Sequence, residues 1–139
     1  MESLLAKAIN AKKTNTPFVC RGSGKPVRQF CYAPGESSPT VFCTALNLSF
    51  LDLAKVIVWA LESYNEEEPL NIAGPEISIK ELSQRIASLV GIESEVVYDL
   101  SYSDGPYKRT VSTEKLNTIW PEFQTTEIST ALESMIKNI

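Results

Sequence analysis

Apolar residues recur with a helical period in five segments of this chain. Residues 3–13 carry one apolar stripe, which predicts an amphipathic helix. Residues 51–64 are apolar around most of their circumference, a pattern typical of helices enclosed between other elements. Further helices are predicted over 79–90, 113–117 and 127–137.

The third of these helices has the clearest boundaries. Ser78 and Glu81 form an S-x-x-E capping box, in which each side chain can satisfy a free backbone N–H of the first turn. Ile77 and Leu82 stand at the hydrophobic-staple positions around it. Gly91 is placed to end the helix, because glycine tolerates the left-handed conformation that helix C-termini adopt.

Strands are fewer and shorter than helices. Segments 18–20, 27–32, 70–73 and 95–98 have strand-like composition, and the turn at 22–26 predicts that the first two form a hairpin. Few strands separated by helices predict a small mixed sheet with about five helices. Such a sheet is part of an α/β protein rather than a complete doubly wound sheet.

Charge is distributed unevenly along the 139 residues, whose formal net charge is −4. An acidic chain is not expected to bind nucleic acid in general. The first 30 residues nevertheless carry one acid, Glu2, and six basic residues: Lys7, Lys12, Lys13, Arg21, Lys25 and Arg28. This segment indicates a local anionic ligand. Solvated lysines on a helix face are the alternative, and they explain Lys12 and Lys13 well.

Histidine is absent from the sequence, which excludes zinc sites built on histidine and Ser-His or Cys-His catalysis. The three cysteines, Cys20, Cys31 and Cys43, lack metal-like spacing, and no metal is expected. The first 13 residues are amphipathic rather than a continuous apolar core, and no apolar run approaches the ~20 residues of a membrane span. A cytoplasmic location without membrane contact is therefore expected.

Two turns carry candidate binding chemistry. In the first, Gly22 and Gly24 allow close backbone approach, and Lys25 and Arg28 can supply charge to a phosphate. A plain hairpin turn is the commoner explanation of a G-S-G sequence, and no dinucleotide-binding or Walker glycine pattern occurs. In the second turn, Asp104 can accept hydrogen bonds from sugar hydroxyls or a base edge, or can cap its own turn.

Four segments, in order, resemble one enzyme family. They read TPFVCRGSGKPVRQFCY, LDLAKVIVWALESYNEEEPLNIAG, ISIKEL and SDGPYKRTVSTEKL. They are similar to the C-terminal part of the GDP-L-fucose synthases, NADP-dependent epimerase-reductases of the extended short-chain dehydrogenase/reductase class. The resemblance implies that residues 1–139 form the substrate-binding C-terminal domain of a Rossmann-type enzyme. The implied substrate is GDP-4-keto-6-deoxy-D-mannose, which is epimerised at C3 and C5 and then reduced at C4 to give GDP-L-fucose.

The resemblance also assigns roles to single residues. Lys7 falls at the family's basic substrate-binding position, Arg28 at the substrate-binding arginine of R-Q-F, and Asp104 at the substrate-contacting aspartate of S-D-G. Arg21 stands where the family usually has tryptophan. Either the packing of the substrate is altered there, or a second phosphate contact has been gained.

Other family features have no match in this sequence. None of the tyrosines has lysine four residues later, and the glycine-rich NADP loop and the catalytic cysteine and histidine are lacking. The N-terminal Rossmann domain is therefore expected to be absent, with no catalytic or NADP-binding residue in this chain. The resemblance implies a homodimer for full-length members. The alternative is a non-catalytic GDP-sugar-binding or interaction fragment, or a chain with no stable function of its own.

Residues 34–50 do not share the resemblance. In the family, the strand before them runs almost directly into the helix that starts near residue 51. These residues are therefore predicted to be an insertion, either retained or mispredicted sequence or a lineage-specific loop.

Overall fold

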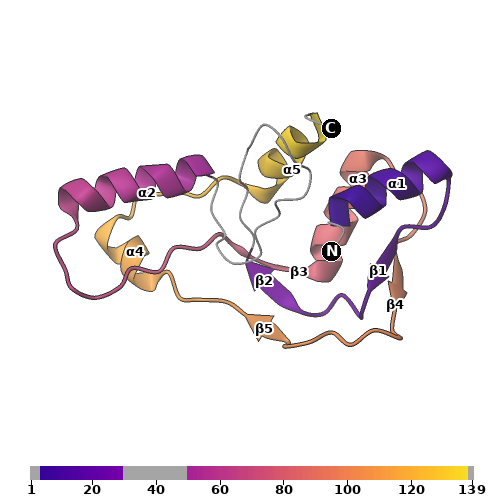
Figure 1. Cartoon of the computed structure of the whole chain (residues 1–139), viewed down its shortest axis with the longest axis horizontal. Coiled ribbons are helices and arrows are strands. Elements are labelled where there is room, and N and C mark those ends of the chain that lie inside the picture. Colours follow the sequence, from indigo (N-terminus) through magenta and orange to yellow (C-terminus); the bar gives the residue numbers. More distant parts are fainter. Residues whose placement is uncertain (1–3, 30–49, 138–139) are drawn as a thin grey trace.

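The computed structural model describes residues 4–29 and 50–137, with helices joined to short strands (Figure 1). The helices and strands are, in order, α1 (Leu4–Thr14), β1 (Val19–Arg21), β2 (Val27–Gln29), α2 (Phe50–Ser63), β3 (Glu76–Ser78), α3 (Ile79–Val90), β4 (Val97–Asp99), β5 (Lys108–Arg109), α4 (Glu114–Ile119) and α5 (Ile128–Lys137). All five predicted helices are present. No helix in these ranges is long and apolar enough to cross a membrane.

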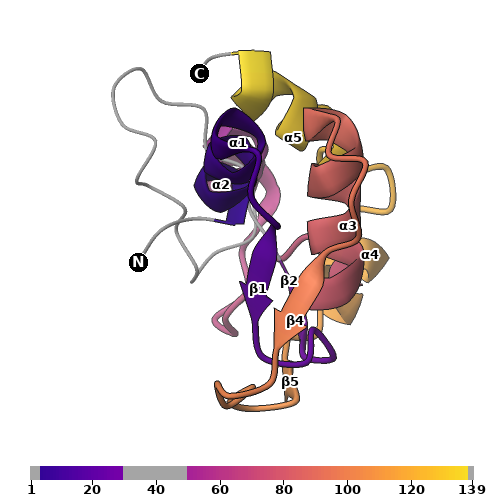
Figure 2. The ribbon, with the colours of Figure 1, turned by 90° about the vertical axis from the view of Figure 1, so that its right-hand side faces the viewer.

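The strands form two small sheets within the described ranges. β1 pairs with β4 in parallel, and the two lie side by side below α1 (Figure 2). β2 is the middle strand of the other sheet, antiparallel to β3 and parallel to β5. The prediction of a mixed sheet in an α/β protein is confirmed.

The predicted β1–β2 hairpin is wrong, because the two strands belong to different sheets. The turn between them binds the start of α3 instead of closing a hairpin. The backbone N–H of Lys80 donates to the carbonyl of Gly24 at 2.8 Å, and that of Ile79 donates to the carbonyl of Pro26 at 3.0 Å. Two long-range bonds therefore direct β2 away from β1.

Two other strand predictions also need correction. Residues 70–73 are not a strand; the strand β3 lies beyond Pro75, where Ile77 can pair with Arg28 of β2. β5 was not predicted, because its two residues have no alternating pattern and become a strand only beside β2. The predicted insertion at 34–50 falls outside the described residues except for Phe50, the first residue of α2.

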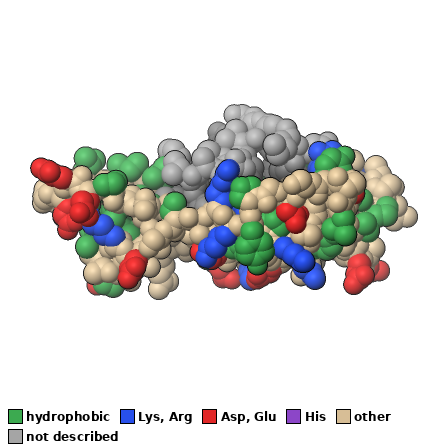
Figure 3. Space-filling model, turned by 90° about the horizontal axis from the view of Figure 1, so that it is seen from below, with side chains coloured by type: hydrophobic (Ala, Val, Ile, Leu, Met, Phe, Trp, Pro, Cys, Tyr) green, Lys and Arg blue, Asp and Glu red, His purple; other side chains and the backbone are tan. Residues whose placement is uncertain are grey.

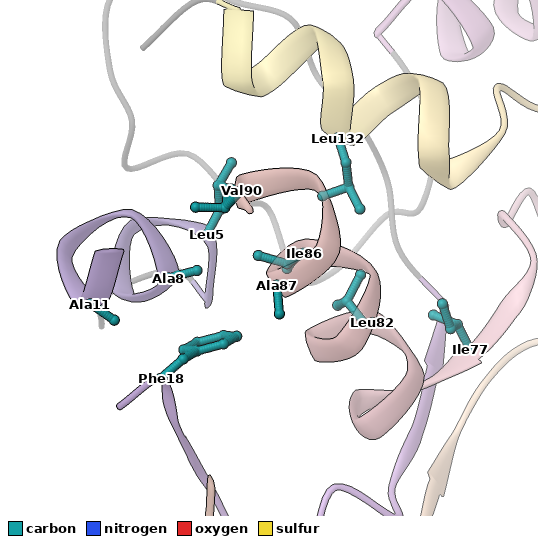
Figure 4. Packing of buried hydrophobic residues seen from close by; sticks show 10 residues of the cluster. All are labelled: Leu5, Ala8, Ala11, Phe18, Ile77, Leu82, Ile86, Ala87, Val90 and Leu132. Atoms are coloured by element: carbon teal, nitrogen blue, oxygen red, sulfur yellow. The ribbon is translucent and has the colours of Figure 1, made fainter. Parts of the chain in front are cut away.

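The core lies between α1, α3 and α5 (Figure 4). Phe18, which precedes β1, has no exposed surface, and its ring lies near Ala8 of α1 and Ala87 of α3. Ile86 of α3 is 2% exposed, and Leu132 of α5 approaches it from the other side. Burial of a side chain as large as Phe18 or Ile86 contributes about 1.5–3 kcal/mol.

Two predicted signals at the ends of α3 are confirmed, the Ser78 cap and the Gly91 end, whereas the Glu81 side chain pairs with Arg85 at 2.8 Å instead of completing the capping box. The Ser78 hydroxyl accepts a hydrogen bond from the backbone N–H of Glu81 at 3.1 Å, which caps the helix. Gly91 has φ +76°, and the N–H of Ile92 donates to the carbonyl of Ala87 at 2.9 Å. The capped helix therefore presents Ile86 and its neighbours to the core.

α2 packs differently from α3. Its Trp59 stacks on Trp120, which follows α4, with ring centroids 4.8 Å apart. Its Asp52 is 2% exposed and accepts a hydrogen bond from the backbone N–H of Thr126 at 2.7 Å. Leu61 on the same helix is 83% exposed, so α2 is covered on one side only. The prediction that this helix is enclosed between other elements is therefore not met on that side of α2 by the described residues.

Candidate substrate-binding site

The two candidate turns lie against each other, although 81 residues separate Ser23 from Asp104. One carboxylate oxygen of Asp104 accepts the backbone N–H of Ser23 at 2.6 Å, and the other accepts the Ser23 hydroxyl at 2.6 Å. These bonds to Ser23, followed by the positive charge of Lys25, lower the pKa of Asp104 below its usual value. We call residues 21–25 and 99–107 the paired loops.

Glycine is required in the first of these loops. Gly22 has φ +86°, and a β-carbon there would lie 2.4 Å from an oxygen of Asp104. Gly24 has φ +75°, and a β-carbon there would lie 2.7 Å from the ring of Tyr98. The glycines thus allow close packing with Asp104 and Tyr98, a contact within the protein that the G-S-G motif alone did not reveal.

Arg28 lies on β2 and holds the second loop from the other end. Its guanidinium donates to the carbonyl of Val27 at 2.7 Å and to that of Pro106 at 2.8 Å, with a longer contact of 3.5 Å to the carbonyl of Tyr107. Carbonyls orient the guanidinium without neutralising it. The carbonyls of the described residues take three of its five N–H donors.

Lys7 lies on α1, close enough to β1 for its charge to act on Cys20. Burial raises the pKa of the Cys20 thiol above its usual value, and the positive charge of Lys7 offsets part of this rise. No recorded contact in the described part of the chain joins Lys7 to Arg28 or Asp104. Cys20 is a strand residue, as expected; Cys31 and Cys43 lie outside the described residues.

Arg21 has its own partners within the paired loops. Its guanidinium lies 4.5 Å from the ring centroid of Tyr102, a cation–π contact. The pKa of Asp99 is lowered by hydrogen bonds from Ser101 and, to a lesser extent, by the charge of Arg21. The Arg21 guanidinium therefore lies over a tyrosine ring of the facing loop.

Basic side chains gather across the middle of the face that carries β5 and the second paired loop (Figure 3). They belong to a surface that also holds carboxylates, so the face is mixed in sign rather than uniformly positive. This surface suits an anion of limited size better than an extended polyanion.

The turn that holds Gly22 and Gly24 does not fit the pyrophosphate of NADP. The pyrophosphate of a dinucleotide binds at a glycine-rich turn between a strand and a helix. Gly22 and Gly24 lie between two strands, and the space beside them is filled by Asp104 and Tyr98. The whole sequence also lacks a Tyr-x-x-x-Lys pair and histidine.

Two residues that hold the paired loops in place were not predicted from the sequence. Ser23 is the partner of Asp104, and Tyr98 packs under Gly24 while its hydroxyl lies 2.9 Å from that of the buried Ser83. Ser23 could have been identified from the sequence, because it stands between the two glycines of the G-S-G motif. Nothing local marked Tyr98, because its position depends on the parallel pairing of β4 with β1.

Comparison with known proteins identifies relatives over nearly the whole chain. No protein-family model matches. A probable GDP-L-fucose synthase of Drosophila melanogaster is 29% identical over 99% of this chain and 38% of its own length. The GDP-L-fucose synthase of Dictyostelium discoideum is 32% identical over 94% of this chain and 36% of its own length. This chain thus spans little more than a third of these relatives.

Solved structures agree with the sequence relatives. A GDP-L-fucose synthetase from Naegleria fowleri bound to NADP aligns with 97% of this chain and 38% of its own, with a TM-score of 0.77 and 30% identity. A dTDP-glucose 4,6-dehydratase of Bacillus anthracis aligns with a TM-score of 0.68 at 16% identity, which shows the fold alone. The chain belongs to the GDP-L-fucose synthase family, as its motifs indicated.

Proposed function

We propose that residues 1–139 form the substrate-binding part of a GDP-L-fucose synthase and bind a GDP-sugar. The proposed substrate is GDP-4-keto-6-deoxy-D-mannose, which the complete enzyme epimerises at C3 and C5 and reduces at C4 with NADPH. The observation that carries the proposal is the pairing of the two family motifs: the Ser23–Asp104 bonds join G-S-G-K-P-x-R-Q-F to S-D-G.

The proposed roles follow from charge and position. Arg28 holds a phosphate with the N–H donors that its carbonyl partners leave free. Asp104 accepts a sugar hydroxyl through lone pairs not used by Ser23. Lys7 adds positive charge from α1, and Arg21 is the possible second phosphate contact, for which its guanidinium would leave Tyr102.

Catalysis is proposed only for a complete enzyme that also supplies the cofactor site. Hydride transfer requires NADP held against the sugar, and a proton donor within hydrogen-bond reach. These 139 residues contribute neither the glycine-rich loop nor the Tyr-x-x-x-Lys pair. In the full-length state the enzyme is proposed to be a homodimer. A chain that acts alone would be a non-catalytic GDP-sugar-binding module. The titration described next tests this alternative as well.

Calorimetric titration of the folded chain with GDP-mannose and GDP-fucose, with GMP for comparison, tests the proposal. We expect saturable binding of both sugars that Arg28→Ala weakens ~10–100-fold, since hydrogen bonds to charged groups contribute about 1.5–3 kcal/mol. Arg85→Ala is the matched control, because Arg85 bonds Glu81 and Ser129 on the helical side of the molecule. Absence of binding by a chain that circular dichroism shows to be folded would refute the proposal for this chain.

A further inference from the structure

The outward face of α2 exposes three large apolar side chains. Ile57 is 49% exposed, Val58 55% and Leu61 83%. Ala54, Val58 and Leu61 follow the spacing of four and three residues that aligns side chains in one stripe along a helix. Scattered apolar residues on a protein surface need no explanation, but a continuous stripe indicates a surface that binds a partner.

A shallow groove lies along this stripe, between α2 and the residue that follows α4. Its lining residues are Ala54, Lys55, Val58, Trp59, Glu62 and Trp120. The two tryptophan rings are stacked on each other, which gives the groove a rigid aromatic wall. An apolar centre with aromatic residues and a charged rim is typical of interfaces between proteins.

The two charged residues of the groove are arranged to match a second α2 helix. Lys55 and Glu62 lie on the same flank of the stripe, seven residues or about 10 Å apart along the helix axis. The side chain of Lys55 is 65% exposed, and its contact with Asp52 is long, at 3.7 Å. Glu62 is exposed and has no recorded partner among the described residues. In an antiparallel pair of such helices, Lys55 of each copy meets Glu62 of the other.

We infer that the outward face of α2 binds a second copy of this chain, with the two α2 helices antiparallel about a twofold axis. The axis passes near Val58 and Trp59, midway between Lys55 and Glu62. The same patch on both copies then forms the interface, and two ion pairs between the helices set their direction and register. The inference does not rest on the proposed function, because α2 lies at the opposite end of the molecule from β1 and β4, where the paired loops begin (Figure 1).

The dimer is expected to be weak. A single pair of helices buries less surface than the roughly 1,600 Å² of a standard interface, for which affinities of about 1 µM or better are found. In the dilute solutions used for circular dichroism the chain is therefore monomeric. Because a twofold contact uses the same patch on both copies, association stops at two chains.

Sedimentation equilibrium of the full chain over a range of concentrations tests the inference. We expect a monomer–dimer equilibrium for the wild type. Glu62→Lys turns both attractive pairs into repulsive ones and should weaken the dimer about 4–30-fold. Glu133→Lys is the matched control, because it makes the same change of charge at an exposed position of α5, and it should stay within about twofold of the wild type.

Two further variants separate the ion pairs from the apolar stripe. The double variant Lys55→Glu with Glu62→Lys exchanges the two charges, restores both pairs and should dimerise within about threefold of the wild type. Leu61→Asp places a carboxylate in the middle of the stripe and should abolish dimerisation, since burial of an unpaired charge is costly. Circular dichroism checks that each variant is folded.

Several outcomes would overturn the inference. A wild type that stays monomeric at the highest soluble concentration would show that α2 does not bind a second copy. Association that continues beyond two chains would exclude a closed twofold contact. A dimer that Glu62→Lys weakens no more than Glu133→Lys does, or that the double variant fails to restore, would exclude the antiparallel register.

Discussion

The core around α3 and the paired loops lie next to each other but are held together by different interactions. In the core, side chains such as Phe18 and Ile86 are at most 2% exposed and contact one another over apolar surface. In the second paired loop, every residue from 100 to 107 is exposed, including Leu100 at 73%. The second loop is held by hydrogen bonds from Ser23 of the first loop and from Arg28 of β2.

The difference teaches which part of the molecule is stable and which part can move. Apolar burial is additive over a large area and does not depend on one atom. An exposed hydrogen bond competes with water, and its net contribution to stability is only about 0.5–1.5 kcal/mol. The loops can therefore open while the core stays folded, which suits a region that has to admit a ligand.

The largest expected effect is in the core. Ile86→Ala is expected to lower the free energy of unfolding by about 2–5 kcal/mol, because it removes buried methylenes and leaves a cavity. Leu61→Ala is the control, since Leu61 is 83% exposed on α2 and its truncation should change stability by less than about 0.5 kcal/mol. Urea denaturation followed by circular dichroism measures both. Equal losses would contradict the placement of the core around α3.

An intermediate effect is expected in the paired loops. Gly22→Ala introduces a β-carbon 2.4 Å from an Asp104 oxygen and strains a backbone at φ +86°, so it should break the Ser23–Asp104 bonds. Gly105→Ala, at φ +67° with nothing within 4 Å, carries only the backbone strain, about 1–2 kcal/mol. Hydrogen exchange at the Ser23 amide distinguishes them, and we expect loss of protection in Gly22→Ala alone. Retained protection would mean that the loops adapt without separating.

The smallest effect is expected on acidification. Because the folded pKa of Asp104 is lowered, its bonds to Ser23 contribute to stability above the ordinary aspartate value of 3.8 and are lost as the pH falls through the lower, folded pKa. The chemical shift of the Ser23 amide should therefore change at a midpoint below pH 3.8. Asp104→Asn should abolish that change, and a midpoint above 3.8 in the wild type would argue against the bonds.

Local signals in the sequence predicted the helices well and the strand partners poorly. Ser78 and Gly91 mark the ends of α3 through contacts made within three or four residues. The partner of β1 is 78 residues away, since Val19 pairs with Val97, and the short strands carry no pattern that distinguishes β4 from β2. The hairpin was therefore the natural prediction and was wrong.

The candidate site shows the same division. Asp104 and Arg28 could be selected by residue type and motif, but their bonds to Ser23 and to the carbonyl of Pro106 arise only when distant segments meet. The position of Tyr98 likewise depends on the pairing of β1 with β4. Sequence thus indicates which residues have suitable chemistry, and the sheet register determines which of them are neighbours.

The stacked pair of Trp59 and Trp120 has a consequence for optical work on this protein. These are the only tryptophans in the sequence, and both lie where α2 meets α4. Intrinsic tryptophan fluorescence therefore reports on that junction and does not report on the region around α3. Fluorescence and far-ultraviolet melting curves will superimpose only if the two regions unfold as one cooperative unit. A shift between the curves would assign each midpoint to its own region without any added dye.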